Sequence, residues 1–198
     1  RYIGENLLKI ISIIEFCEEN DIPGLLISID FEKAYDHVEW NAIKYALKFF
    51  NFGENIIRWI TTLYKNVKSC VINNGHFSEF FTLERGVRQG CPLSPYLFII
   101  VAELLALKIR GDNDIEGITI NNITHKLSQF ADDTCIVTLF KQENLRAIFQ
   151  AFDIFQQTAG LKINYNKTDI LRLGSLRNSE AKLYTQKSLN WTNNPLLI

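Results

Sequence analysis

The sequence of 198 residues contains no methionine and has only three histidines and four cysteines. The cysteines lie far apart and form no Cys-x-x-Cys pair, so we expect reduced, mostly buried thiols, as in an intracellular protein. The histidines have no partners at the spacing of zinc ligands, which argues against a zinc site. The chemistry of this chain must therefore rest on other residue types.

The chain also lacks a long apolar run and a marked net charge. No segment approaches the length of a membrane-spanning helix, so no membrane partner is expected. The formal net charge of -1 gives no global indication of nucleic-acid binding. The charge is uneven, however, because the segment from Lys162 onward has six basic and two acidic residues. Because the sequence begins without methionine and ends in Asn-Asn-Pro-Leu-Leu-Ile, we expect a fragment of a longer protein.

What the chain does contain is 47% hydrophobic residues, in patterns typical of a folded α+β domain. Helical spacing predicts helices at residues 5–20, 38–50, 55–65, 95–110 and 145–155. Apolar runs predict strands at residues 25–29, 134–140, 161–164 and 168–173. Hairpins are predicted around Asn74-Gly75 and Asn121-Asn122, where turn residues separate alternating apolar segments.

Several helix ends are predicted from capping residues. Asp36, with Glu39 three positions later, resembles an acidic capping box for the helix that begins near Val38. Ser94 is expected to be the N-cap of a helix that is apolar nearly all round and is therefore buried. Gly160 is expected to end the last helix.

The stretch QFADDTCIV, residues 129–137, places two carboxylates side by side between apolar segments. Such like charges repel each other and are costly to bury unless a positive group accompanies them. Asp30 ends another buried strand, so Asp30, Asp132 and Asp133 converge if the two strands are neighbours. Converging carboxylates suit Mg²⁺, and two such ions about 3.5–4 Å apart support nucleotidyl transfer. An Asp-Asp pair in an ordinary turn is the alternative.

Four motifs occur in order along the chain. They are SIDFEKAYD (Ser28–Asp36), GVRQGCPLSPYLF (Gly86–Phe98), FADD (Phe130–Asp133) and AGLKINYNKT (Ala159–Thr168). Together they closely resemble reverse transcriptases of LINE-type, non-LTR retrotransposons, and the opening RYIGENLL resembles the fingers region of that family. The resemblance covers residues 1–174 and implies the palm of a right-hand polymerase, an antiparallel sheet packed on helices, with part of the fingers. Residues 175–198 would begin an incomplete segment leading towards a thumb that is missing.

This resemblance implies the core of an RNA-directed DNA polymerase that uses two Mg²⁺ ions, with Mn²⁺ as a possible substitute. Asp30 and Asp132 would be the principal metal-bridging carboxylates, and Asp133 would be the second member of the acidic pair. The backbone carbonyl of Phe31 would be a further metal ligand. Lys167 would neutralise or protonate the leaving pyrophosphate, with an exposed lysine in a turn as the alternative.

The same resemblance implies a nucleotide site. Tyr35 would close the sugar pocket and exclude a 2′-hydroxyl, with plain core packing as the alternative. Gln89 would contact the incoming nucleotide, and Gly90 would let the backbone approach closely. Arg88 would contact a phosphate unless it is an ordinary surface charge. Cys91 is expected to be inert, because nothing beside it would lower its pKa.

The partners implied by the resemblance are an RNA template, a DNA primer and dNTPs, with no obligate protein partner and a nuclear and cytoplasmic location. The 198 residues alone are expected to be inactive, because the regions that hold the duplex would lie outside them. Two other interpretations stay open. One is a group II intron-type reverse transcriptase, and the other is a degenerate, non-catalytic remnant.

Overall fold

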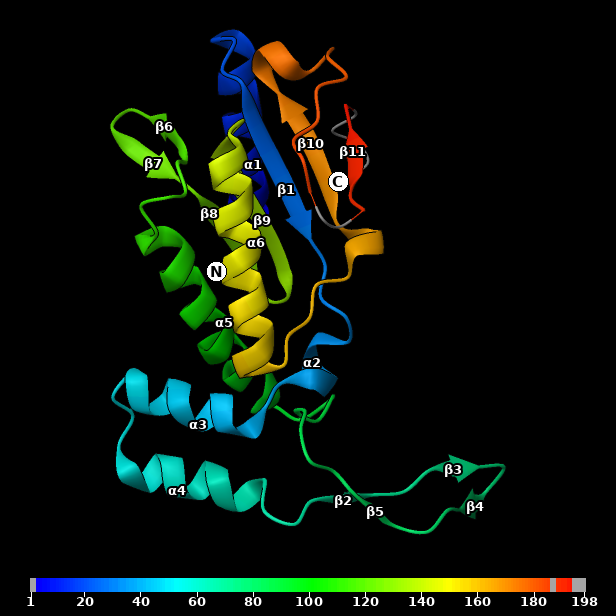
Figure 1. The fold of residues 1–198 in the computed structure, drawn as a ribbon. Coiled ribbons are helices and arrows are strands. Elements are labelled where there is room, and N and C mark those ends of the chain that lie inside the picture. Colours follow the sequence, from blue (N-terminus) through cyan, green and yellow to red (C-terminus); the bar gives the residue numbers. More distant parts are fainter. Residues whose placement is uncertain (1–2, 186–187, 194–198) are drawn as a thin grey trace.

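The computed structural model describes residues 3–185 and 188–193 and is built around a five-stranded sheet (Figure 1). Its strand order is β11-β10-β1-β9-β8, in which only the β10–β11 pair is parallel. Its strands are β1 (Gly24–Ile29), β8 (Leu127–Phe130), β9 (Asp133–Leu139), β10 (Asp169–Leu173) and β11 (Asn190–Thr192). Two-stranded sheets are formed by β2 (Lys68–Ser69) with β5 (Phe81–Thr82), β3 (Ile72–Asn73) with β4 (His76–Phe77), and β6 (Ile118–Ile120) with β7 (Ile123–His125).

Helices cover both faces of the large sheet. They are α1 (Ile3–Glu19), α2 (Ala34–His37), α3 (Trp40–Phe49), α4 (Glu54–Leu63), α5 (Ser94–Gly111) and α6 (Gln142–Ala159), with 3₁₀ turns η1 (Tyr165–Lys167) and η2 (Gly174–Leu176). Helices α5 and α6 pack on one face and α1 packs on the other. No helix in the described ranges has the length and apolar character needed to cross a membrane. The expected α+β class with a mainly antiparallel sheet is confirmed.

The central strand β1 is buried on both faces. Leu25 and Ile27 join the core cluster that contains α5 and α6, whereas Leu26 packs with Ile13 of α1 in a second cluster. A strand with two buried faces shows a continuous apolar run rather than alternation, which explains the sequence Leu-Leu-Ile-Ser-Ile. Packing on both faces therefore fixes the strand that presents Asp30 at its end.

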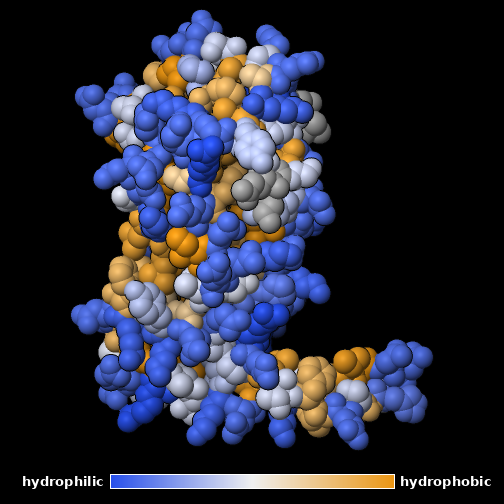
Figure 2. Space-filling model, viewed as in Figure 1, coloured by the Kyte–Doolittle hydropathy of each residue, from blue (hydrophilic) through white to orange (hydrophobic). Residues whose placement is uncertain are grey.

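Residues 68–82 form a narrow arm that projects from the body beyond α4 (Figure 1). At its tip Asn74 and Gly75 have φ angles of 49° and 78°, which suit a two-residue hairpin turn and confirm the predicted hairpin. The hairpin at Asn121 and Asn122, with φ angles of 48° and 64°, is also confirmed. The arm exposes several large apolar side chains (Figure 2): Val71, Ile72, Phe77, Phe80 and Phe81.

The prediction that Asp36 caps the helix at residues 38–50 is wrong. Asp36 lies inside the short helix α2, and α3 begins at Trp40 with no side-chain cap from Glu39. Instead, the Glu39 N–H donates to the carbonyl of Ala159 at the end of α6, at 3.0 Å. A contact with a distant helix therefore satisfies a backbone donor that a local cap was expected to satisfy.

Two other local predictions are also wrong, and one is confirmed. Ser94 is the first residue of α5, and the N-cap position, one residue earlier, makes no side-chain cap hydrogen bond. Residues 161–164 form no strand and contribute only an isolated bridge between Ile163 and Phe31, because β10 pairs with β1. Gly160 ends α6 with a φ of 79°, as predicted.

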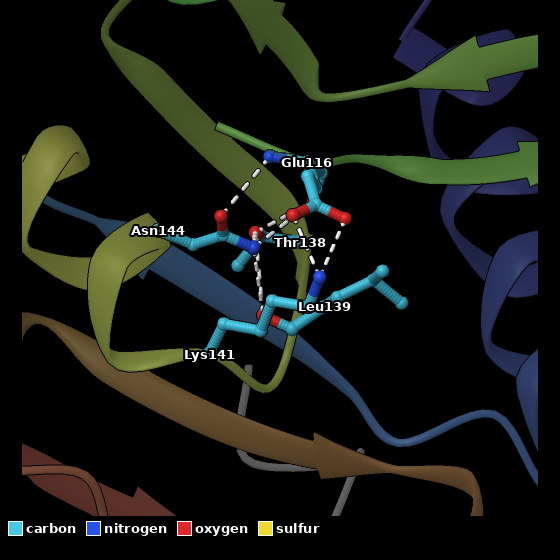
Figure 3. Close-up of polar contacts among 5 residues, drawn as sticks. All are labelled: Glu116, Thr138, Leu139, Lys141 and Asn144. Atoms are coloured by element: carbon cyan, nitrogen blue, oxygen red, sulfur yellow. Dashed lines mark hydrogen bonds and ion pairs between the residues drawn. The ribbon is translucent and has the colours of Figure 1, made fainter. Parts of the chain in front are cut away.

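A polar cluster, buried at Thr138 and Asn144 and exposed at Glu116 and Lys141, joins the start of α6 to the end of β9 (Figure 3). The Asn144 side-chain nitrogen donates to Thr138 Oγ1 at 2.8 Å and to the Leu139 carbonyl at 3.1 Å. Its side-chain oxygen accepts the Glu116 N–H at 3.2 Å, and Lys141 pairs with the Glu116 carboxylate at 2.7 Å. This cluster lies at the opposite end of β9 from Asp133 and anchors α6 there.

Candidate active site

The two acidic motifs meet at one end of the large sheet. Strands β1 and β9 are antiparallel, and their register pairs Ile29 with Thr134. Asp30 follows Ile29 and Asp133 precedes Thr134, so both carboxylates lie at the same end of neighbouring strands. Asp132 lies in the two-residue turn between β8 and β9. The structure therefore brings together the three carboxylates that the sequence singles out.

The three carboxylates interact electrostatically and open to solvent. Burial and the negative charges of Asp132 and Asp30 raise the pKa of the Asp133 carboxyl. Asp132 and Asp133 are exposed, and Asp30 is half-buried. Over residues 3–185 and 188–193, no three or more acidic, histidine or cysteine side chains form a group that could hold a metal ion. An open set of oxygen donors still fits Mg²⁺, which keeps several waters and binds through one or two carboxylates and substrate phosphates.

The acidic turn is conformationally strained. Ala131 has a φ of 53°, in the left-handed region that residues other than glycine rarely adopt. The pairing of Phe130 with Asp133 closes the turn around it. Residues in such conformations persist only where their surroundings hold them, and they cluster at functional sites. This geometry presents Asp132 at the tip of the hairpin.

The backbone after Asp30 is held from one side by the segment that precedes β10. The Asp30 carbonyl accepts the Asn164 N–H at 2.8 Å, and the Glu32 N–H donates to the Lys162 carbonyl at 2.9 Å. Asp30 and Glu32, on either side of Phe31, both bond towards this segment. Because backbone groups alternate in direction along an extended chain, the carbonyl of Phe31 points to the opposite side. That is the side on which β9 and its acidic turn lie.

Tyr35 belongs to the core and also lies close to the carboxylates. Its ring stacks on Phe98 of α5, with ring centroids 5.0 Å apart and planes 10° apart. Burial and the charge of Asp132 raise the pKa of the Tyr35 hydroxyl. Core packing thus fixes the ring of Tyr35 in a position where its hydroxyl interacts electrostatically with Asp132.

The loop before the Gln-Gly pair is clamped against α2. The Val87 N–H donates to the Tyr35 carbonyl at 2.7 Å, and the Gly86 N–H donates to the Val38 carbonyl at 2.8 Å. Gly86 has a φ of 88°, and a Cβ on it would lie 2.7 Å from the carbonyl oxygen of Asp36. Only glycine permits this approach, so the loop and α2 form one rigid unit.

Gln89 and Gly90 face open space at the edge of that unit. The Gln89 amide donates to the Asp36 carboxylate at 3.4 Å, a role for Asp36 that the sequence does not indicate. Gly90 has a φ of 80°, and a Cβ there would meet nothing within 4 Å. The glycine is therefore required by the backbone conformation and not by a protein neighbour. Gln89 lines a cavity of about 450 Å³, together with Arg88 and Tyr64.

Lys167 and Arg88 are both exposed. Lys167 ends η1, and Asp169, two residues later, pairs with Ser28 near the acidic end of the sheet. Arg85, by contrast, forms a surface ion pair with Glu39 at 3.7 Å. The positions of Lys167 and Arg88 suit contact with a bound phosphate and equally suit a surface charge, so their roles stay predictions.

The prediction that nothing lowers the pKa of Cys91 is wrong. A hydrogen bond from the backbone of Leu93 is the largest cause of the lowered pKa of this thiol, and contacts with Ser94 and the charge of Arg88 act in the same direction. These backbone groups belong to the start of α5, where free N–H groups favour a thiolate. The pKa of Cys135 is instead raised by burial, in agreement with an inert thiol.

Sequence comparison identifies related proteins over most of the chain. The family described as "Reverse transcriptase (RNA-dependent DNA polymerase)" matches residues 4–192. The "Transposon TX1 uncharacterized 149 kDa protein" of Xenopus laevis is 27% identical over 89% of this chain and 14% of its own length. The "Retrovirus-related Pol polyprotein from type-2 retrotransposable element R2DM" of Drosophila melanogaster is 27% identical over 72% of this chain and 13% of its own length. The chain thus spans only a small part of these relatives.

Structural comparison finds similar folds among telomerases. Apo telomerase from Candida tropicalis matches with a TM-score of 0.64 at 16% identity, over 92% of this chain and 34% of that chain. Telomerase from Candida albicans in complex with a TWJ fragment of telomeric RNA matches with a TM-score of 0.61 at 11% identity, over 92% of this chain and 31% of that chain. These similarities confirm the expected right-hand polymerase fold.

Proposed function

The chain belongs to the reverse transcriptase (RNA-dependent DNA polymerase) family, and we propose that it is the core of an enzyme that extends a DNA primer on an RNA template with dNTPs. The observation that carries this proposal is the convergence of Asp30, Asp132 and Asp133 at the end of two paired strands. The names of the related retrotransposon proteins support a template that is the RNA of a mobile element.

Two Mg²⁺ ions would be held by Asp30, Asp132, Asp133 and the carbonyl of Phe31, and Mn²⁺ would be able to replace them. When bound, such ions activate the attacking 3′-hydroxyl and stabilise the leaving pyrophosphate. Asp30 contributes by following a strand that is buried on both faces, and Asp132 contributes by lying in a short, closed turn. The backbone positions of both carboxylates would then be set before the substrates arrive, which would lower the cost of ordering them.

The incoming nucleotide would lie between Tyr35 and the Gln-Gly loop. The Tyr35 ring, fixed by its stacking on Phe98, would occupy the space that a 2′-hydroxyl needs. Gln89 would exchange its long hydrogen bond with Asp36 for a contact with the nucleotide. Arg88 would contact a phosphate, and Lys167 would deliver a proton or a positive charge to the leaving pyrophosphate.

Residues 1–174 would comprise the fingers and palm, and residues 175–198 would lead towards the thumb. Residues 1–2, 186–187 and 194–198 of these ranges lie outside the described residues. A template–primer duplex would bind mainly through its phosphates, so its affinity should fall steeply as salt is raised. The protein would recognise the A-form shape of the RNA–DNA hybrid by contacting the sugar-phosphate backbone and the 2′-hydroxyls of the hybrid.

Primer extension tests this function directly. The protein encoded by the complete reading frame around this chain would be given a labelled DNA primer on an RNA template, with Mg²⁺ and either dNTPs or rNTPs. We expect extension with dNTPs. A well-folded protein that extends no primer with either Mg²⁺ or Mn²⁺ would instead be a non-catalytic remnant, and extension on DNA templates alone would exclude an RNA-directed enzyme.

Replacing Tyr35 with alanine should weaken the preference for dNTPs over rNTPs. Removing the ring opens the space for a 2′-hydroxyl. A difference of one small group in a binding pocket changes the selectivity between two substrates by about 10–200-fold. The measurement is the ratio of kcat/KM for dCTP and CTP in single-nucleotide extension. Tyr45→Ala, which removes an exposed ring on α3, is the matched control. Unchanged selectivity in Tyr35→Ala would leave Tyr35 with its packing role alone.

A further inference from the structure

Two buried polar side chains face each other immediately behind the acidic turn. Gln129 of β8 and Thr134 of β9 are cross-strand partners, and they are only 7% and 1% exposed. A buried amide or hydroxyl is unfavourable unless it is hydrogen-bonded, and apolar side chains would fill this place without that requirement. The Gln129 side-chain nitrogen donates to Thr134 Oγ1 at 3.2 Å, so each buried side chain has the other as a partner across the strands.

The hydrogen bonds continue from this pair in both directions. Thr134 Oγ1 donates to the backbone carbonyl of Asp132 at 3.5 Å, a long bond inside the turn. On the other side, the backbone carbonyl of Gln129 accepts from the side-chain nitrogen of Asn6 in α1 at 3.0 Å, across 123 positions of sequence. A hydroxyl has one donor and two acceptor sites, so Thr134 is able to accept from Gln129 while it donates to Asp132.

The acidic turn needs support of this kind. Ala131 is held at a φ of 53°, which is unfavourable for a residue with a Cβ. Asp132 and Asp133 are adjacent like charges, and Asp30 lies at the same end of the neighbouring strand. Backbone strain and charge repulsion both favour a more open arrangement, so contacts from the sheet must hold the turn closed.

We propose that Gln129 and Thr134 are positioning residues that hold the acidic turn in the geometry that binds divalent metal, and that Asn6 anchors this pair to α1. The inference rests on the proposed function, which assigns the metal site to the carboxylates. Gln129 and Thr134 act through the backbone of Asp132. Hydrogen-bonding partners of this kind change metal affinity by about 10–100-fold when they are removed.

The test measures the binding of Mn²⁺ to the 198-residue chain, and electron paramagnetic resonance detects the ion that stays free. Urea unfolding of the same chain measures its stability. Thr134→Val keeps the β-branched shape and removes the hydroxyl, and Thr134→Ser restores the hydroxyl. The matched control is Thr138→Val, because Thr138 is also buried in β9 and donates to the Glu116 carbonyl at 2.8 Å, but at the other end of the strand.

We expect Thr134→Val to weaken Mn²⁺ binding by about tenfold or more, and Thr134→Ser to restore the wild-type Kd. Thr138→Val should lower the free energy of unfolding and leave the Kd unchanged. If wild-type protein binds Mn²⁺ and Asp132→Asn does not, but Thr134→Val binds normally or Thr138→Val is equally impaired, the positioning role is wrong and the proposed function stands. If folded wild-type protein binds no Mn²⁺, the metal assignment fails and this inference fails with it.

Discussion

Replacing Asp132 with asparagine is expected to abolish extension of a DNA primer on an RNA template. Asparagine keeps the size of the side chain but removes the charge that would hold a divalent cation. Losing several kcal/mol of transition-state stabilisation corresponds to a fall in kcat on the order of a thousandfold. The measurement is single-turnover extension with dNTPs, using the complete reading frame and saturating Mg²⁺.

Asp112→Asn is the matched control for this substitution. Asp112 caps the far end of α5, and its pKa is lowered chiefly by a hydrogen bond from Lys108, with which it pairs at 2.8 Å. Its loss should leave the extension rate unchanged, since Asp112 follows the end of α5, beyond the residues Ile99, Ala102 and Glu103 that lie beside the acidic hairpin. Extension by Asp132→Asn at the rate of Asp112→Asn would contradict a catalytic role for the acidic turn.

Gly86→Ala should cause a large loss of stability. The added Cβ would meet the Asp36 carbonyl at 2.7 Å, on a residue whose φ is 88°. Strain from the positive φ is worth about 1–2 kcal/mol, and overpacking adds about 1–3 kcal/mol, so the free energy of unfolding should fall by roughly 2–5 kcal/mol. Urea unfolding of the 198-residue chain measures this loss.

Gly90→Ala tests the cost of backbone strain without a steric clash of the added Cβ. Its φ of 80° is similar, but a Cβ there would meet nothing within 4 Å. Only the backbone strain of about 1–2 kcal/mol should therefore appear in the free energy of unfolding. Because Gly90 faces the proposed nucleotide site, its substitution should raise the KM for dNTPs in primer extension. Equal destabilisation by the two substitutions would show that the clamp between the loop and α2 has no energetic importance.

Elements with strong local signals were predictable from the sequence. The apolar periodicity of α1 and α6, the continuous apolar run of β1 and the Asn-Gly turn of the arm all have local physical causes. The failures occurred where distant contacts decided the structure. Asp36 and Glu39 resemble a capping box, yet the end of α6 bonds to the Glu39 N–H and α3 begins only at Trp40. No pattern within ten residues of Asp36 reveals that contact.

The candidate site was likewise predictable from the sequence only in part. The carboxylates could be selected from the sequence because Asp30 ends an apolar run and the Asp-Asp pair interrupts another. Their convergence required the strands to be neighbours, which only the pairing of β1 with β9 establishes. The contact of Gln89 with Asp36 and the lowered pKa of Cys91 were missed because both depend on how separate segments meet. The functional roles of Tyr35, Arg88 and Lys167 stay predictions.

The position of β1 in the sheet also constrains the order in which the protein folds. Its two partners, β9 and β10, are both more than one hundred residues later in the sequence. Closing such long loops is slow and must precede any gain from pairing. During synthesis, Asp30 therefore leaves the ribosome long before its neighbouring strands exist. Helix α1 is made before β1 and covers one face of it, but the face that packs on α5 and α6 stays exposed until those helices are made. The acidic end of the sheet is thus among the last parts to assemble, and a chain that stops before β10 would leave one edge of β1 open to association with other chains.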